Sequence, residues 1–169
     1  MLYGAEAPFD APLSPSQPRS SCSALAAARR RRRAGLPVSA SDLRRFELGY
    51  ARTELRRRLV GAVLRGEKTA TSSLRTEYEP YAGDPLPRPG ERFALLHFDD
   101  RPVAVVETTE VRVLRVADVD LAFARDEGEG FETVADWRAA HERFWAEHDI
   151  REDTEIVAER FRVVERLDA

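Results

Sequence analysis

The sequence predicts an α+β domain in which mostly antiparallel strands are accompanied by two main helices. Residues 54–65 and 134–145 place apolar side chains at helical spacing, each behind a threonine that can cap a helix. Residues 92–116 contain two apolar stretches joined by a short polar turn, which is the pattern of a β-hairpin. In residues 155–164, apolar and polar side chains alternate as they do in a half-buried strand.

Residues 1–40 differ in composition from the rest of the chain. They are rich in Ala, Ser, Pro and Arg and include the run Arg29 to Arg33. Such a segment buries too little apolar surface to fold, so we expect a disordered tail over residues 1–40. The remainder, residues 42–167, has the length of one domain. The chain as a whole has 43% apolar and 34% charged residues, which is typical of a soluble globular protein.

The first helix is expected to begin after Thr53 and to end at Gly66. Its apolar positions share one face: Leu55, Leu59, Ala62 and Val63. The chain then continues through Thr69 to Leu74 as a strand or extended turn. A long loop with four prolines, Arg75 to Gly90, follows. Its length indicates a rim or lid over a site.

The second half of the domain is expected to contain the hairpin and the second main helix. The hairpin joins Arg92–Phe98 to Pro102–Val116 through a tight turn at residues 99–101. A short helical stretch, Ala117–Arg125, is expected to be capped by Asp118. The second main helix follows the acidic loop at 126–130 and Thr133, with these apolar-face residues: Val134, Trp137, His141, Phe144 and Trp145.

Several protein classes are disfavoured by the sequence. No apolar run approaches the roughly 20 residues of a membrane span. Cys22 is the single cysteine, so an intrachain disulfide is impossible and the cytoplasm is the expected location. His141 and His148 lie further apart than the one helical turn of a paired metal motif. We therefore expect no metal and no other cofactor, and the net charge of -3 does not by itself indicate a nucleic-acid binder.

Lys68 is the only lysine in a chain that has 26 arginines. Where any cation suffices this chain uses arginine, so the surviving lysine indicates a site that needs an amine able to lose its proton. Thr71 follows three residues later, where the first helix gives way to extended chain. A lysine beside a threonine hydroxyl can activate it as a nucleophile. On spacing alone, a structural lysine near the helix C-terminus is an equally good interpretation.

The arrangement Gly66-x-Lys68-x-x-Thr71, preceded by a helix and followed by Pro89-Gly90-Glu91-Arg92, resembles the signature of the ASCH family. Residues 105–111 resemble the central strand of that family. Residues 127–130 and 137–141 resemble the acidic loop and helix of its larger bacterial members. The resemblance covers roughly residues 46–165.

This resemblance implies a PUA-like β-barrel with helices at its rim and a cleft for a modified nucleoside or RNA. Small members of the family include an amidohydrolase that removes the acetyl group of N4-acetylcytidine with a Lys, a Thr and a Glu. Lys68 and Thr71 match the first two positions, and either Glu127 or Glu129 matches the third. In that chemistry the lysine takes the proton of the threonine, whose oxygen attacks the acyl carbonyl.

Further residues are expected to bind the substrate around this pair: Thr69, Ser72, Ser73, Arg75, Tyr78 and Glu107. Arg75, Tyr78 and Tyr81 have the chemistry to stack on or clamp a base, but Tyr and Arg in a proline-rich loop more often pack in its rim. Two alternatives to the amidohydrolase remain, a non-catalytic RNA-binding module and a metal-independent ribonuclease. Neither a membrane nor an obligate protein partner is indicated.

Overall fold

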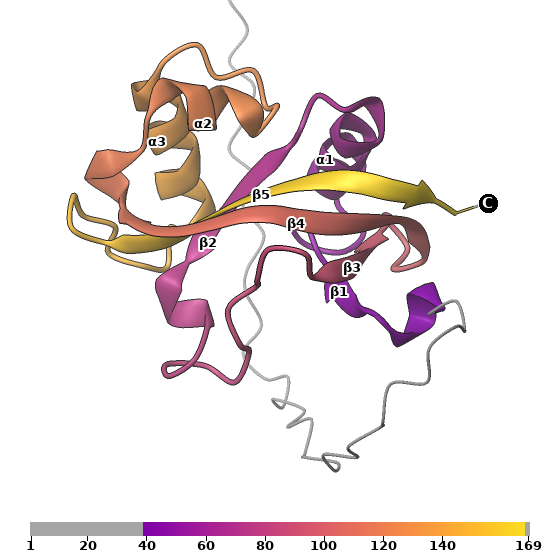
Figure 1. Cartoon of the computed structure of the whole chain (residues 1–169). Helices are drawn as coiled ribbons and strands as arrows, with labels where there is room; N and C mark the ends of the chain where they lie inside the picture. The colour runs from indigo at the N-terminus through magenta and orange to yellow at the C-terminus, as the bar shows by residue number, and fades with distance from the viewer. Residues whose placement is uncertain (1–38, 168–169) are drawn as a thin grey trace, which may run out of the picture. The chain divides into compact units, whose positions relative to one another are not determined.

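The computed structural model describes residues 39–167 and contains five strands and three α-helices in this part of the chain (Figure 1). In chain order the elements are β1 (Arg44–Phe46), α1 (Glu54–Arg65), β2 (Ala70–Leu74), β3 (Arg92–Leu96), β4 (Pro102–Arg115), α2 (Leu121–Asp126), α3 (Val134–Phe144) and β5 (Glu155–Arg166), with short 3-10 turns at Ala40–Asp42, Arg75–Glu77 and Val116–Asp118. The tail expected over residues 1–40 lies, up to residue 38, outside the described residues.

The strands form one sheet in the order β1-β3-β4-β5-β2. β1 pairs with β3 in parallel, and the other three pairs are antiparallel, which confirms the expected α+β class. Within residues 39–167, the edge strands β1 and β2 do not pair with each other. The sheet is therefore open rather than a closed barrel. β1 has only three residues, too few to supply the continuous ladder that closure needs.

Helix α1 has the limits expected from its sequence. The Thr53 side chain accepts a hydrogen bond from the Arg56 N–H at 3.2 Å, and Gly66 ends the helix in the left-handed conformation, with a φ of 77°. The buried face of α1 packs in a core with residues of β1, β3, β4 and β5: Phe46, Leu59, Val60, Val63, Phe93, Leu95, Val106 and Phe161. This core lies toward one end of the long strands (Figure 1).

Helices α2 and α3 cover the other end of the long strands (Figure 1). Their core contains residues of both helices, β2 and β5: Ala70, Leu74, Phe123, Trp137, Trp145, Ile156 and Ala158. The expected cap of the short helix was wrong. Asp120, not Asp118, accepts the Phe123 N–H at 2.7 Å, because the chain makes a 3-10 turn before α2 begins. Asp118 instead pairs with Arg115.

None of the helices described within residues 39–167 is long and apolar enough to cross a membrane. The same residues contain no cluster of three or more His, Cys, Asp or Glu side chains arranged to hold a metal ion.

Candidate functional site

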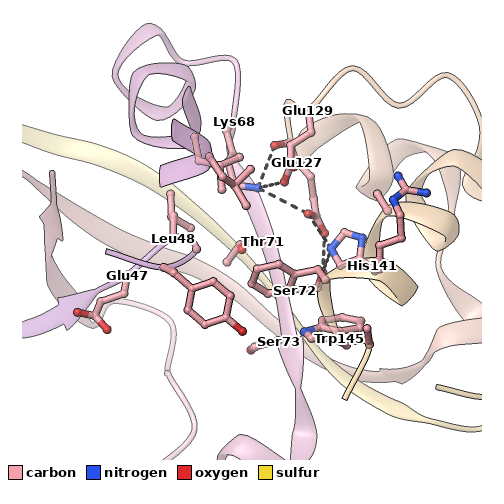
Figure 2. A pocket seen from close by; sticks show the side chains of 18 of the residues that line it. Glu47, Leu48, Lys68, Thr71, Ser72, Ser73, Glu127, Glu129, His141 and Trp145 are labelled. Carbon is pink, nitrogen blue, oxygen red and sulfur yellow. Dashed lines mark hydrogen bonds and ion pairs between the residues drawn. The ribbon is translucent and has the colours of Figure 1, made fainter. Parts of the chain in front are cut away.

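A cleft of about 880 Å³ lies where α1, β2, the loop after α2 and the end of α3 meet (Figure 2). The residues that line it include four from the segment around β2 and four from the acidic loop and α3: Lys68, Thr71, Ser72, Ser73, Glu127, Glu129, His141 and Phe144. The tertiary structure thus brings together Lys68, Thr71, Glu127 and Glu129, the four residues expected to carry chemistry.

Lys68 is 2% exposed, and its amine is surrounded by oxygen atoms. Its Nζ lies 3.0 Å from the backbone oxygen of Glu127, 3.0 Å from Oε1 of Glu129 and 3.6 Å from Oε2 of Glu127. The first two are hydrogen bonds and the third is an ion pair, so the amine is held by the acidic loop. Within residues 39–167, no hydrogen bond joins the Lys68 amine to the Thr71 hydroxyl, although both side chains line the cleft.

Gly128 lets the acidic loop approach the segment that carries Lys68. Its φ is 66°, and a Cβ at this position would lie 2.6 Å from the Cα of Lys68 and would also collide with the Glu67 backbone. A glycine is therefore required where the loop crosses the chain between α1 and β2. This close approach brings Glu127 and Glu129 within reach of the Lys68 amine.

Glu127 is 1% exposed and receives hydrogen bonds from several elements. Its Oε1 accepts from Ser72 Oγ at 2.7 Å and from Trp137 Nε1 at 2.9 Å, and its Oε2 lies 3.4 Å from His141 Nε2. Burial on its own raises the pKa of Glu127. The hydrogen bond from His141 and the positive charge of Lys68 outweigh burial and lower the pKa to about 2. Glu127 is therefore an ionised anchor of the site.

The contacts of His141 hold its ring beside Glu127. Nδ1 lies 2.9 Å from the Trp137 carbonyl, which can only accept, so Nδ1 carries a proton. Nε2 lies 3.0 Å from Ser72 Oγ, which also donates to the Glu127 carboxylate. The ring stacks on Trp137, with 4.2 Å between centroids.

Glu127 and Glu129 both contact the Lys68 amine but differ in their access to the cleft. Glu129 Oε1 lies 3.0 Å from Lys68 Nζ, and Glu127 Oε2 lies 3.6 Å from it. The Glu129 side chain is 18% exposed against 1% for Glu127, and it is the one of the two that a ligand in the cleft can reach.

The other residues expected to bind substrate are divided between the cleft and its surroundings. Ser72 and Ser73 line the cleft. Tyr78 contacts Ser73, with its hydroxyl oxygen 2.7 Å from Ser73 Oγ. Burial raises the pKa of the Tyr78 phenol. Thr69 lies beside the Asp126 carbonyl, which accepts its backbone N–H at 2.8 Å.

Arg75 and Glu107 lie in other surroundings. The guanidinium carbon of Arg75 lies 5.3 Å from the centroid of the Tyr81 ring. Both residues line a smaller pocket of about 370 Å³. Glu107 forms ion pairs with Arg92 and Arg162 on the sheet. Neither Arg75 nor Glu107 lines the cleft, and the same is true of Thr69 and Tyr78.

Sequence reasoning did not single out Glu159, which lies opposite Thr71 in the β2–β5 ladder. It is 6% exposed and accepts a hydrogen bond from Thr108 Oγ1 at 2.5 Å. Burial raises the pKa of Glu159 to about 7. A signal was present, since Glu159 shares the alternating strand positions of Val157 and Phe161, both of which are buried. Tyr50, Arg58 and Arg143 also line the cleft and were not anticipated.

Comparison with known proteins identifies the domain. The sequence model of the ASCH domain family matches residues 47–165. The chain is similar to the ASCH domain from Lactobacillus crispatus JV V101, with 32% identity over 64% of this chain and 71% of that one and a TM-score of 0.58. It is also similar to protein EF3133 from Enterococcus faecalis V583, with 28% identity, 71% and 75% coverage and a TM-score of 0.63. Curated proteins gave no match. The open, mostly antiparallel sheet with its helices is consistent with a PUA-like fold, and the chain belongs to the ASCH domain family.

Proposed function

We propose that this protein hydrolyses the amide of an N4-acylated cytidine or a closely related modified nucleoside. The observation that carries the proposal is the placement of the Lys68 amine, 3.0 Å from the Glu129 carboxylate, in a cleft that Thr71 also lines. This gives one cleft a nucleophile, a basic group and an acid, which are the three groups that acyl transfer from nitrogen to oxygen requires.

The contacts of Lys68 determine how the reaction begins. In the proposed reaction Lys68 begins as an ammonium, held by two hydrogen bonds and an ion pair, and first passes a proton to Glu129 along their hydrogen bond. The neutral amine then takes the Thr71 proton as the Thr71 oxygen attacks the acyl carbonyl. The protonated Glu129 gives its proton to N4 as the C–N bond breaks, so cytidine leaves and Lys68 is again an ammonium.

Water completes the reaction. It attacks the acyl–Thr71 ester, one of its protons returns to the Thr71 oxygen, and the acyl group leaves as a carboxylic acid. Glu127 takes no part in these transfers, because both of its carboxylate oxygens are already engaged by neighbouring side chains. In the proposed mechanism its role is to hold Lys68 and Ser72 in place.

Incubation of the purified full-length chain with N4-acetylcytidine tests this activity. Chromatography should show cytidine and acetate in equal amounts. Lys68→Arg and Thr71→Val should abolish their release, because the first removes an amine that can be deprotonated and the second removes the nucleophile. Thr69→Val is the matched control, since Thr69 is near the site but does not line the cleft. A wild-type protein inert toward a panel of N4-acylated cytidines would contradict the proposal.

RNA binding without catalysis is a second candidate, and one observation favours it. The Lys68 amine is held by two hydrogen bonds and by ion pairs with two glutamates, which suits a fixed cation at least as well as a base. This alternative predicts salt-sensitive RNA binding that survives Thr71→Val, measured by gel shift at low and moderate salt. Shortened RNA on the same gels in the presence of EDTA would indicate metal-independent cleavage instead. Absence of both a shift at low salt and any shortened RNA would eliminate both RNA functions.

A further inference from the structure

The cleft carries two exposed aromatic side chains that pack against each other. Among the described residues, the exposed large hydrophobic side chains are Tyr50, Tyr81, Val113, Phe144 and Val164. Only Tyr50 and Phe144 of this group line the cleft, and their ring centroids lie 5.6 Å apart at an interplanar angle of 36°. Exposed apolar surface gathered beside a polar cleft marks a place where a ligand is bound.

The backbone segments that carry the two rings are held in place by neighbouring elements. The Gly49 carbonyl accepts from Arg56 Nη2 at 3.0 Å, and the Tyr50 carbonyl accepts from Thr53 Oγ1 at 2.6 Å, so the turn before α1 is tied to that helix. Phe144 is the last residue of α3 and directly precedes the buried Trp145. The two rings therefore come from different walls of the cleft, and a ligand can stack on them without refolding either wall.

The polar groups of the cleft indicate the remaining chemistry of that ligand. Lys68 is buried, whereas Tyr50 is 68% exposed, so the rings lie at the mouth and the proposed reacting groups lie deeper. Five carboxylates line the cleft: Glu47, Glu77, Glu127, Glu129 and Glu147. The lysine and arginine side chains among the lining residues are fewer: Arg58, Lys68 and Arg143. This charge balance disfavours phosphate groups and favours a neutral ligand.

We propose that Tyr50 and Phe144 form a stacking subsite for the base of a neutral nucleoside. The assignment rests on the proposed function, because the nucleoside is the ligand whose acylated edge would reach Lys68 and Thr71. A nucleobase fits the site as a flat ring with a polar edge: its face covers the exposed aromatic surface while its edge extends into the polar depth of the cleft.

Equilibrium binding of unmodified cytidine tests the subsite apart from catalysis, since cytidine has no acyl group to lose. Tyr50→Ala and Phe144→Ala should each raise the Kd about tenfold, the effect expected from losing one base-stacking contact. Tyr81→Ala should leave the Kd unchanged. It is the matched control because its ring is 65% exposed and lies outside the cleft. Cytidine 5′-monophosphate should bind no more tightly than cytidine.

Each outcome separates this proposal from the amidohydrolase activity. Unchanged cytidine affinity in both ring variants, or no cytidine binding by the wild type, would overturn the subsite even if N4-acetylcytidine is hydrolysed. Ring-dependent cytidine binding by a protein that hydrolyses no acylated cytidine would support the subsite and contradict the proposed enzyme. A Kd for the monophosphate well below that for cytidine would overturn the restriction to neutral ligands.

Discussion

Lys68 and Glu127 are buried side by side, each with a side chain only 1% exposed, and the Lys68 amine lies 3.0 Å from the Glu127 backbone oxygen and 3.6 Å from its carboxylate. The contact joins the segment after α1 to the loop after α2, 59 residues further along the chain. Lys68 and His141 both contact the same carboxylate. Glu127 therefore contributes both to the stability of the fold and to the geometry of the site.

Removal of the Glu127 carboxylate should destabilise the fold strongly. Glu127→Ala leaves Lys68 without this counter-charge in a buried site, and a broken buried ion pair typically costs about 3–5 kcal/mol. Urea unfolding followed by circular dichroism measures the loss. Glu67→Ala is the control, because Glu67 pairs with Arg65 on the exposed surface, and its unfolding midpoint should match the wild type. Equal midpoints for the two variants would show that Glu127 is not the anchor described above.

Substitutions of the two acidic-loop glutamates, Glu127 and Glu129, should have different effects on kcat and on stability. Glu129→Gln removes the proposed proton carrier at a partly exposed position, so kcat should fall by about 100-fold or more while the unfolding midpoint stays near that of the wild type. Glu127→Gln should mainly lower the midpoint. Steady-state kinetics and urea titrations on both variants make the comparison. A Glu129→Gln enzyme with wild-type kcat would remove Glu129 from the mechanism.

Gly128 and Gly130 form a matched pair for testing the approach of the acidic loop to Lys68. Both have positive φ, 66° and 85°, so alanine is strained at each. Only at Gly128 would the added Cβ also collide with backbone. Gly128→Ala should therefore be less stable than Gly130→Ala by a further 1–3 kcal/mol or so and should lose activity. Similar behaviour of the two variants in unfolding and activity assays would contradict this packing.

Replacement of His141 should raise the pKa of Glu127. His141→Gln keeps a polar group beside Ser72 but removes the imidazole whose hydrogen bond helps to lower that pKa to about 2. A lowered carboxyl pKa contributes stability that is present above the ordinary value of 4.5 and is lost as pH falls toward 2. Urea titrations should show that the variant is less stable at pH 7 and loses less stability across that acidic window. Equal losses of stability in the wild type and the variant would contradict this role of His141.

Glu159 should make the fold less stable as pH rises. Its folded pKa of about 7 lies above the ordinary 4.5, so the folded state holds a proton that the unfolded state has already released between these values. The contribution is complete below about pH 4.5 and is lost as pH rises through 7, on the order of 3 kcal/mol in all. Glu159→Gln keeps the acceptor for Thr108 and should remove this slope. If urea titrations from pH 4.5 to 8 show the same change of unfolding free energy with pH for the wild type and Glu159→Gln, this role of Glu159 is contradicted.

Local sequence patterns predicted most of the secondary structure. Thr53 and Gly66 delimit α1 because capping depends on a few neighbouring residues, and the alternation of β5 needs only one strand. Local patterns did not predict the features that depend on residues far away in the chain. β1 has three residues and exists because it pairs with β3, and an isolated Asp118 is as good a cap as Asp120 until the 3-10 turn is known.

The sequence by itself determined most of the elements, the family resemblance and the choice of Lys68 and Thr71 as candidates, since spacing and composition are properties of neighbouring residues. The tertiary structure decided which glutamate is buried with Lys68 and which is partly exposed, that His141 belongs to the site, and that Tyr50 and Phe144 meet at its mouth. It also left the sheet open. These features depend on contacts between segments far apart in the chain, and such contacts are fixed by packing of the whole domain rather than by local preference.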